Sequence, residues 1–183
     1  MMIGILPTTL EVEGKQYQIN SDFRVALLIF QAYSDPDLTD YEKVLVCLKC
    51  LYKEKPPNQE LALERAVWFL DGGDMPKAEQ VPKKIMDWEH DQSIIFPAVN
   101  KVAGFETRTS EYLHWWSFLG LFNEIGEGLY SQVMNIRSKQ AKGKKLEKHE
   151  REFYIQHKSL VNIPERITAE EKAELDFINN LVR

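Results

Sequence analysis

The chain has little cysteine and no long apolar run. Only two of its 183 residues are cysteines, Cys47 and Cys50, so a structural disulfide framework is excluded. The longest apolar stretches, residues 25–30 and 118–122, are much shorter than the roughly 20 residues that cross a bilayer as a helix. Residues 1–9 lack the basic stretch and apolar core of a secretory signal. We therefore expect a cytoplasmic protein without a membrane span.

Signatures of catalysis and of cofactor binding are also missing. The sequence contains no GxSxG or HExxH motif, and neither GxGxxG nor GxxxxGK[ST], the glycine-rich loops that bind phosphates. The CxxC pair lies in the middle of a helical pattern, where no helix N-terminus activates a thiol, and the four histidines complete no zinc-binding spacing with it. We expect both thiols to pack in the core, and we expect no enzymatic activity, no metal and no cofactor.

The composition is that of an ordinary globular domain. Hydrophobic residues make up 44% of the chain and charged residues 28%. A chain of this length can bury roughly two thirds of its unfolded surface without disulfide staples. The sequence predicts one domain over residues 1–183, mainly α with some β (α+β). It comprises an N-terminal β-hairpin at about 9–20, a helical body at about 22–138 and charged C-terminal helices at about 146–182.

The N-terminal segment alternates polar and apolar residues in the manner of a hairpin. Residues 9–13 and 16–20 flank the pair Gly14-Lys15, and glycine followed by another residue suits a two-residue type II′ turn. A lone hairpin is marginally stable in water, so its apolar side chains must pack on other elements. These side chains are Leu10, Val12, Tyr17 and Ile19.

Helical spacing of apolar residues predicts the remaining elements, with capping boxes at Thr39/Glu42 and Thr168/Glu171. Residues 74–80 read as an exposed link, and Pro97 is expected to bend or split the helix that contains it. The helix that starts near residue 110 is the most apolar, so we expect it in the core. The expected helices cover, in chain order, about 22–35, 39–52, 58–72, 82–103, from near 110, 127–138, 146–160 and from 168.

Residues 87–91 form a charged cluster with one tryptophan. Asp87, His90 and Asp91 are three and four residues apart and could share one helical face able to hold a metal. Metal sites usually draw ligands from a second element, and no second motif accompanies this cluster. The interpretation we favour is a solvated face of carboxylates, with Trp88 turned inward.

A second cluster consists of His114, Trp115 and Trp116, followed by Phe118. It could suggest a ligand or a stacking platform for one. Consecutive side chains of a helix point in different directions, so these rings form no single flat platform. Their large apolar area favours packing in the core or against a partner.

Basic residues are concentrated between residues 137 and 151. This segment holds seven of the 23 basic residues and two of the 28 acidic ones, so it is locally positive while the remainder is strongly acidic. A basic patch can bind phosphates, but this one lacks interleaved aromatic residues, and the acidic remainder would repel a polyanion. We favour a solvated linker or helix face over a nucleic-acid site.

The order of these clusters resembles a known phage family. The chain presents residues 66–69 (Ala-Val-Trp-Phe), then 87–91 (Asp-Trp-Glu-His-Asp), then 112–118 with His-Trp-Trp-Ser-Phe, then Ile136-Arg137. In this order, and with its N-terminal hairpin, it is similar to the family named after gene product fifteen of bacteriophages. One departure is Pro97, which interrupts a stretch that is often alanine-rich in the family. The candidate partner-binding or core-organising residues are Trp88, Asp91, His114, Trp115, Trp116, Phe118 and Arg137.

The resemblance implies a role in phage tail assembly. Such proteins are typically encoded in tailed phages and prophages of Gram-positive bacteria, between the major tail protein and the tape-measure protein. That position implies a chaperone that binds the tape-measure protein, together with other tail-assembly proteins, in the cytoplasm of the bacterial host. Self-association is compatible with this role, whereas contact with membranes or nucleic acid is not expected. The alternative is a minor structural protein of the virion, in the tail or the head–tail region.

Overall fold

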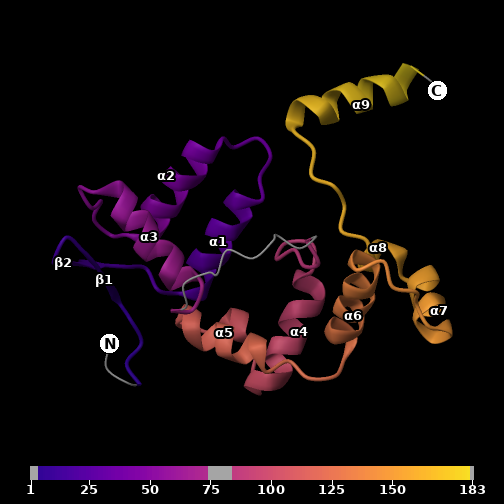
Figure 1. The fold of residues 1–183 in the computed structure, drawn as a ribbon, viewed down its shortest axis with the longest axis horizontal. Helices are drawn as coiled ribbons and strands as arrows, with labels where there is room; N and C mark the ends of the chain where they lie inside the picture. Colours follow the sequence, from indigo (N-terminus) through magenta and orange to yellow (C-terminus); the bar gives the residue numbers. More distant parts are fainter. Residues whose placement is uncertain (1–3, 74–83, 182–183) are drawn as a thin grey trace.

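The computed structural model describes residues 4–73 and 84–181 and is mainly α-helical, as the sequence predicts (Figure 1). One antiparallel hairpin precedes the helices, and a single 3₁₀ turn lies between the fourth and fifth helices within these ranges. The elements are β1 (Thr9–Val12), β2 (Lys15–Gln18), α1 (Phe23–Tyr33), α2 (Asp40–Leu51), α3 (Gln59–Leu70), α4 (Gln92–Ala103), η1 (Thr107–Thr109), α5 (Trp115–Asn123), α6 (Leu129–Ala141), α7 (Lys148–Gln156), α8 (Lys158–Val161) and α9 (Ala169–Leu181).

The hairpin forms where expected, but its turn is shifted by one residue. Val12 pairs with Lys15, so the two turn residues are Glu13 and Gly14 rather than Gly14 and Lys15. Both have positive φ, 53° for Glu13 and 78° for Gly14. Two successive positive φ values define a type I′ turn, which also matches the twist of the strands. The expected type II′ turn was therefore wrong, because a glycine at the second turn position serves type I′ equally well.

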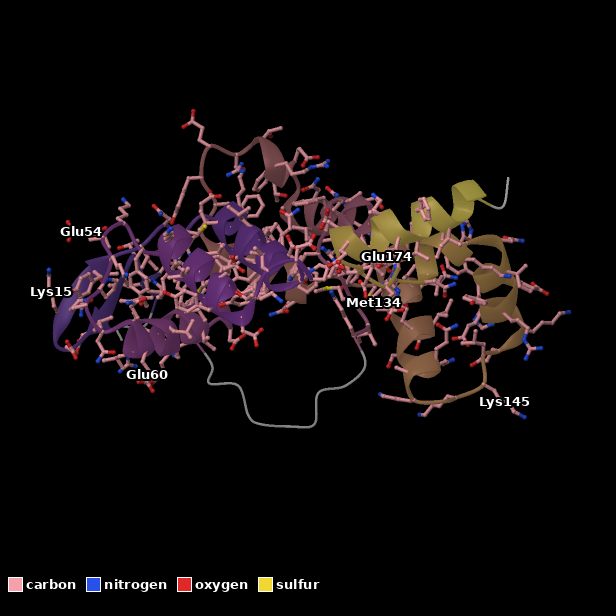
Figure 2. All side chains as sticks on the ribbon, turned by 90° about the horizontal axis from the view of Figure 1, so that it is seen from above. Lys15, Glu54, Glu60, Met134, Lys145 and Glu174 are labelled. Carbon is pink, nitrogen blue, oxygen red and sulfur yellow. The ribbon has the colours of Figure 1, made fainter. Side chains whose placement is uncertain are left out.

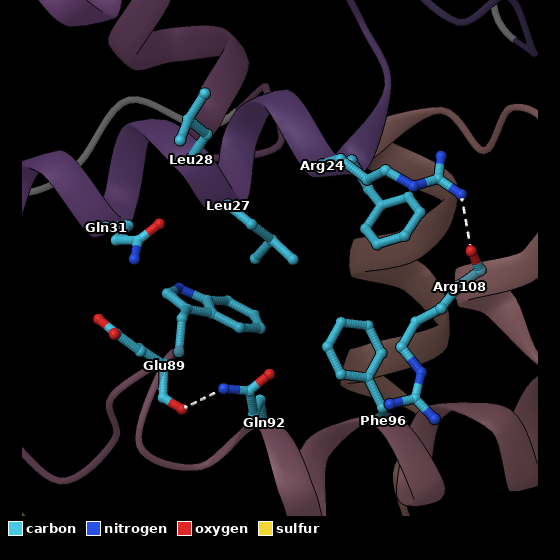
Figure 3. Close-up of a pocket in the computed structure, with 10 residues that line it drawn as sticks. Arg24, Leu27, Leu28, Gln31, Glu89, Gln92, Phe96 and Arg108 are labelled. Carbon is cyan, nitrogen blue, oxygen red and sulfur yellow. Dashed lines mark hydrogen bonds between the residues drawn. The ribbon is translucent and has the colours of Figure 1, made fainter.

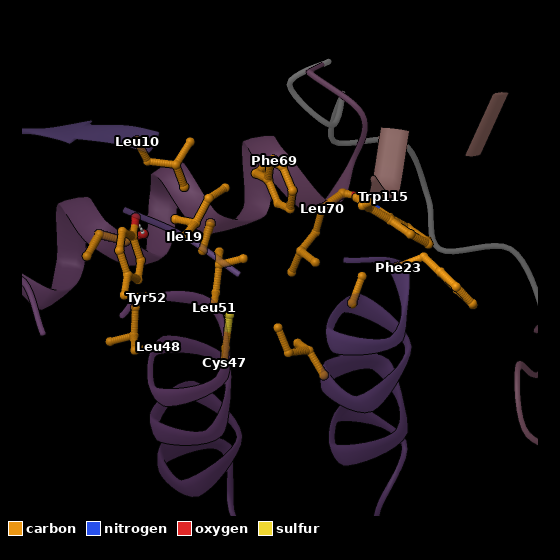
Figure 4. Close-up of a cluster of buried hydrophobic side chains, with 14 of the residues drawn as sticks. Leu10, Ile19, Phe23, Cys47, Leu48, Leu51, Tyr52, Phe69, Leu70 and Trp115 are labelled. Atoms are coloured by element: carbon orange, nitrogen blue, oxygen red, sulfur yellow. Dashed lines mark hydrogen bonds between the residues drawn. The ribbon is translucent and has the colours of Figure 1, made fainter. Parts of the chain in front are cut away.

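One buried cluster unites the hairpin with α1–α5 (Figure 4). Ile19 forms a bridge with Tyr52 after α2, so the chain following α2 continues the hairpin on the β2 side. Cys47 is fully buried and Cys50 is partly buried. The hairpin contributes all four side chains expected from its alternation, each of them buried: Leu10, Val12, Tyr17 and Ile19.

Local capping explains why the first helices begin close to their expected positions. The Asp22 carboxylate accepts a hydrogen bond from the Arg24 N–H at the start of α1. Thr39 and Glu42 form the expected capping box at the start of α2. Each cap satisfies backbone donors that the helix itself leaves without a partner.

The middle of the chain departs from the predicted helices. Residues 84–91 form an irregular turn, and α4 starts only at Gln92. The reason is that the Asp87 carboxylate binds the N–H groups of Glu89 and His90, which favours a turn over a helix. α4 then continues unbroken through Pro97, so the expected split does not occur. The predicted link at 74–80 lies outside the described residues.

Two further boundaries differ from expectation. The apolar helix predicted from near residue 110 begins at Trp115, because the preceding residues are extended and bridge to the start of α1 at Asp22 and His114. The helix predicted over 146–160 is divided at His157 into α7 and α8. The backbone of His157 (φ −123°, ψ 37°) is not helical, which accounts for the break.

The C-terminal helices extend the fold beyond the main core. α6 packs against α4, and α8 packs against α6, with Val133, Ile136 and Val161 buried between them. α9 begins beside the loop between α1 and α2 and runs outward to the C-terminal end of the described chain (Figure 1). Among the described residues, no helix has the length and apolar character required to cross a membrane.

Candidate functional site

The two consecutive tryptophans of α5 join that helix to the end of α3. The indole N–H of Trp115 donates to the Leu70 carbonyl (2.9 Å), and that of Trp116 donates to the Phe69 carbonyl (2.8 Å). These carbonyls lie in the last turn of α3, where the helix itself supplies no N–H donors for its carbonyl oxygens. Trp115 is 1% exposed, and Trp116 is partly buried. The predicted core packing is confirmed, and Phe118, stacked on Trp115, is also fully buried.

The chain that leaves α3 passes directly under the Trp116 ring. A Cβ atom at Gly73 would lie 2.9 Å from a carbon of this ring, and the φ of Gly73 is +96°. Both features require glycine, since a side chain would collide with the ring and would strain the backbone. Gly73 therefore lies directly against the ring of Trp116, whereas a Cβ at the preceding Gly72 would lie 3.3 Å from the side chain of Leu119.

His114 is a structural cap rather than a free ligand. Its Nδ1 accepts the N–H of Trp116 (3.0 Å) at the start of α5, so Nε2 carries the proton and donates to the Pro7 carbonyl (2.9 Å). Burial lowers the pKa of His114, because the charged imidazolium loses its hydration, although the Pro7 carbonyl opposes this shift. The neutral ring therefore ties the N-terminal segment to α5.

Asp91 and Arg137 form a buried ion pair. Two guanidinium nitrogens bind the two carboxylate oxygens at 2.6 and 2.7 Å. The remaining guanidinium N–H groups donate to the carbonyls of three residues, so all five donors have acceptors. These carbonyls belong to Ile85, Leu160 and Val161. Arg137 therefore connects α6, the turn before α4 and the end of α8.

Asp87 is buried beside this pair and has its own cations. Its carboxylate binds Lys84 (2.6 Å) and Arg166 (3.0 Å). Burial by itself raises the pKa of Asp87, but the hydrogen bonds from Lys84, the His90 N–H and Arg166 together outweigh it and hold the pKa well below its ordinary value. The predicted solvated face was therefore wrong. Asp87 and Asp91 are buried, because each has cations and backbone N–H groups that replace water.

The other members of the 87–91 cluster lie where expected or make no site. Trp88 turns inward as predicted and contacts Trp115 and Phe122 at ring-centre distances of 6.1 and 5.0 Å. His90 Nε2 lies 4.0 Å from an Asp91 oxygen and has no hydrogen-bond partner among the described residues. In this part of the chain no three histidine, cysteine or acidic side chains gather as a metal-binding group would.

The basic segment 137–151 divides into buried and exposed parts. Arg137 is buried, so the solvated reading is wrong for this residue, and Lys139 binds the buried carboxylate of Glu150. Lys145, in the loop between α6 and α7, projects from the body (Figure 2). The exposed part agrees with the predicted solvated face, and its members are Lys142, Lys144, Lys145, Lys148 and Arg151.

A groove of about 440 Å³ opens between α1 and the start of α4 (Figure 3). Its floor is apolar and includes Leu27, Trp88 and Phe96, while Leu28 on its edge is 51% exposed. The rim is polar and carries charges of both signs: Arg24, Gln31, Glu89, Gln92 and Arg108. No local motif in the sequence indicates this groove. The one sequence feature that points to it is the composition of α1, which is apolar on nearly all sides. A helix that buries a single face needs fewer apolar residues.

A second groove of similar size, about 450 Å³, lies between α4 and the start of α6. Its apolar lining includes Pro97, Val102 and Leu129, the last of which is 48% exposed. The charged residues on its edge are Lys101, Glu124 and Glu127. The described chain thus includes at least these two grooves with apolar linings, on a body joined by a hydrophobic core and by buried ion pairs.

These features define a class: a small helical protein with a short N-terminal hairpin and open apolar grooves. The chain belongs to the family described as Bacteriophage Gp15 protein, whose model matches residues 2–163. The family suggested by the sequence is thus confirmed, and the match ends before α9. Comparison with curated proteins gave no match, and comparison with solved structures gave none either.

Proposed function

We propose that this phage protein is a tail-assembly chaperone that binds helical segments of the tape-measure protein. It acts by binding and not by catalysis, in the cytoplasm of the bacterial host, alongside other tail-assembly proteins. Family membership supports the association with phage, and the tail-assembly role is what the resemblance to this family implies. The observation that carries the binding mode is the groove between α1 and α4, with its apolar floor and charged rim.

The shape of the groove suits one face of an amphipathic helix. A tape-measure protein is expected to be a long helix with apolar stripes, which would associate with one another if they stayed exposed. The floor around Trp88, together with Leu28 on its edge, offers apolar contact to such a stripe, and the polar rim lies beside the polar flanks of the helix. Each contact is small, so binding is reversible per site and is reinforced by many copies along one client.

Co-expression with the tape-measure protein of the same phage tests the proposal. The tape-measure protein should be soluble when the chain is present and insoluble without it, and the two should co-purify with several copies of the chain per client. Leu28→Glu should weaken this binding about tenfold or more, because it places a carboxylate against the apolar floor. Leu129→Glu probes the second groove in the same way.

The matched control is Ile155→Glu, which adds the same charge at an exposed isoleucine of α7 that lines neither groove. This variant should behave like the wild type. Unchanged tape-measure solubility without co-purification would refute the chaperone role. Detection of the chain in purified virions at a fixed copy number would favour the alternative of a minor structural protein.

A further inference from the structure

α9 is an amphipathic helix that the body leaves uncovered. All of its described side chains are exposed, including the apolar Leu175 (49%), Phe177 (66%) and Ile178 (54%). Leu175 and Ile178 are three positions apart and therefore lie on the same side of the helix. Isolated helices of about 13 residues are marginally stable in water, so a helix of this kind normally gains its stability from packing. The side of α9 that carries Leu175 and Ile178 therefore offers apolar contact to a partner.

The start of α9 is fixed to the body close to the first groove. Arg166, three residues before α9, binds both Asp87 and the groove-rim residue Glu89 at 3.0 Å. The Ala169 N–H donates to the Asp37 carboxylate (2.9 Å), and Thr168 with Glu171 forms the predicted capping box. With these contacts in place, α9 runs away from α1 and α4 (Figure 1). Its apolar face therefore cannot reach the groove of its own chain unless they break.

From this arrangement we infer that α9 of one copy docks in the α1–α4 groove of a second copy. A second copy can accept the helix while all the contacts at the base of α9 stay intact. The size is suitable, since 13 residues make a helix of roughly 20 Å and the α1 wall of the groove has 11 residues. If the exchange is reciprocal, two copies form a closed dimer with two identical contacts.

Charge selects this groove over the one between α4 and α6. α9 carries four acidic residues and one basic residue, Glu174 among them (Figure 2). At the α1–α4 groove Arg24 is paired with Asp22, Arg108 with Glu106 and Glu89 with Arg166, so the rim is close to neutral. The other groove has two acids and one lysine on its edge, which repel an acidic helix. The contact is thus mainly apolar, and the α1–α4 groove is the one whose charges do not oppose it.

This self-association uses the same α1–α4 groove that we propose as the binding site for a tape-measure helix, the client of the chaperone. It depends on the proposed function only in one consequence, that a client helix and α9 compete for the same floor. Without the tape-measure protein, the α1–α4 groove of each copy would then be covered by α9 of another copy. Binding of a tape-measure helix would displace α9 and separate the copies. The exchange itself needs no client and is tested without one.

The test is the molar mass of the full chain by light scattering after size-exclusion chromatography, over a range of concentrations. The wild type should exceed the monomer mass increasingly as concentration rises. The double variant of α9, Leu175→Glu/Ile178→Glu (the arm variant), should be monomeric. The groove variant, Leu28→Glu, should be monomeric as well. Ala173→Glu, which adds a charge on the opposite side of α9 from Leu175, should behave like the wild type.

Mixing the arm variant with the groove variant tests whether one copy supplies α9 and the other the groove. The arm variant keeps an intact groove, and the groove variant keeps an intact α9. The mixture should regain a mass near that of a dimer at high concentration. A wild type that is monomeric at every concentration would overturn the inference, and so would an arm variant with unchanged mass. A groove variant that still dimerises would refute this groove as the docking site. If the wild-type chain forms dimers as expected but does not bind the tape-measure protein, that result would count against the proposed function alone.

Discussion

Arg137 and Asp91 are 46 residues apart in the chain, yet they form a two-pronged ion pair in which every guanidinium N–H has an acceptor. The side chain of Asp91 is 0% exposed and that of Arg137 is 5% exposed, so neither charge is compensated by water. This pair connects α6 with the turn before α4 and thereby fixes the wall from which Trp88 enters the groove. The candidate site thus depends on a contact outside it.

Removal of one partner of this pair should destabilise the protein strongly. In Arg137→Met the Asp91 carboxylate would remain buried without its cation, at a cost of about 3–5 kcal/mol. Arg137→Lys should recover little, because a single ammonium cannot bind both carboxylate oxygens and three carbonyls at once. Urea unfolding of both variants measures the effect. A loss below about 1 kcal/mol in Arg137→Met would show that the pair is not structural.

The close contact between Gly73 and the Trp116 ring predicts a second position that is sensitive to substitution. Gly73→Ala places a methyl group against the indole ring and strains a backbone with φ +96°, so it should cost about 1–3 kcal/mol. Gly126→Ala is the matched control, since a Cβ there meets nothing within 4 Å and the φ of Gly126 lies outside the left-handed region. Thermal unfolding compares the two. Equal melting temperatures for both variants would contradict the close contact between Gly73 and Trp116.

Asp87 predicts a loss of stability in acid. Its pKa in the folded protein lies below the ordinary value of 3.8, so the unfolded chain takes up a proton first as the pH falls. The stabilisation is therefore complete above about pH 5 and is lost as the pH falls toward the folded pKa. Asp87→Asn should cost about 1.5–3 kcal/mol at pH 7, and its difference from the wild type should shrink at pH 3. Unfolding curves at both values decide it, and a pH-independent difference would refute this assignment.

The sequence predicted those parts of the fold that depend on local patterns. The hairpin alternation, the capping box at Thr39 and the dense apolar stretch of α5 are each readable over a few residues. The Thr168/Glu171 box likewise marked the start of α9. The order of the aromatic clusters was enough to suggest the family.

The predictions that were wrong concern features that depend on contacts between residues distant in the sequence. Nothing near Asp87 or Asp91 indicates that Arg166 and Arg137 will cover them, so the cluster reads as a solvated face. The same pairing explains why α4 begins late, since the Asp87 carboxylate holds the turn that precedes it. The α1–α4 groove arises from the packing of two helices far apart in sequence, which periodicity within one helix does not reveal.

The turn of the hairpin supplies a prediction of increased stability. Glu13 occupies the first position of the type I′ turn with φ 53°, a conformation that costs most residues about a kilocalorie per mole but suits asparagine. Glu13→Asn should therefore raise the free energy of unfolding by about 0.5–1 kcal/mol, less whatever is lost with the hydrogen bond from Asn58 to the Glu13 carboxylate (2.8 Å). That bond is exposed, so its loss should be the smaller effect.

Glu13→Gln is the control for this turn, because it removes the charge and keeps both the side-chain length and an oxygen that can accept from Asn58. Its backbone preference resembles that of glutamate, so its stability should be close to that of the wild type. Urea unfolding of the three proteins separates the effects of backbone and charge. If Glu13→Asn is no more stable than Glu13→Gln, the positive φ is not a source of strain. If both variants gain equally, relief of charge repulsion at the turn is responsible instead.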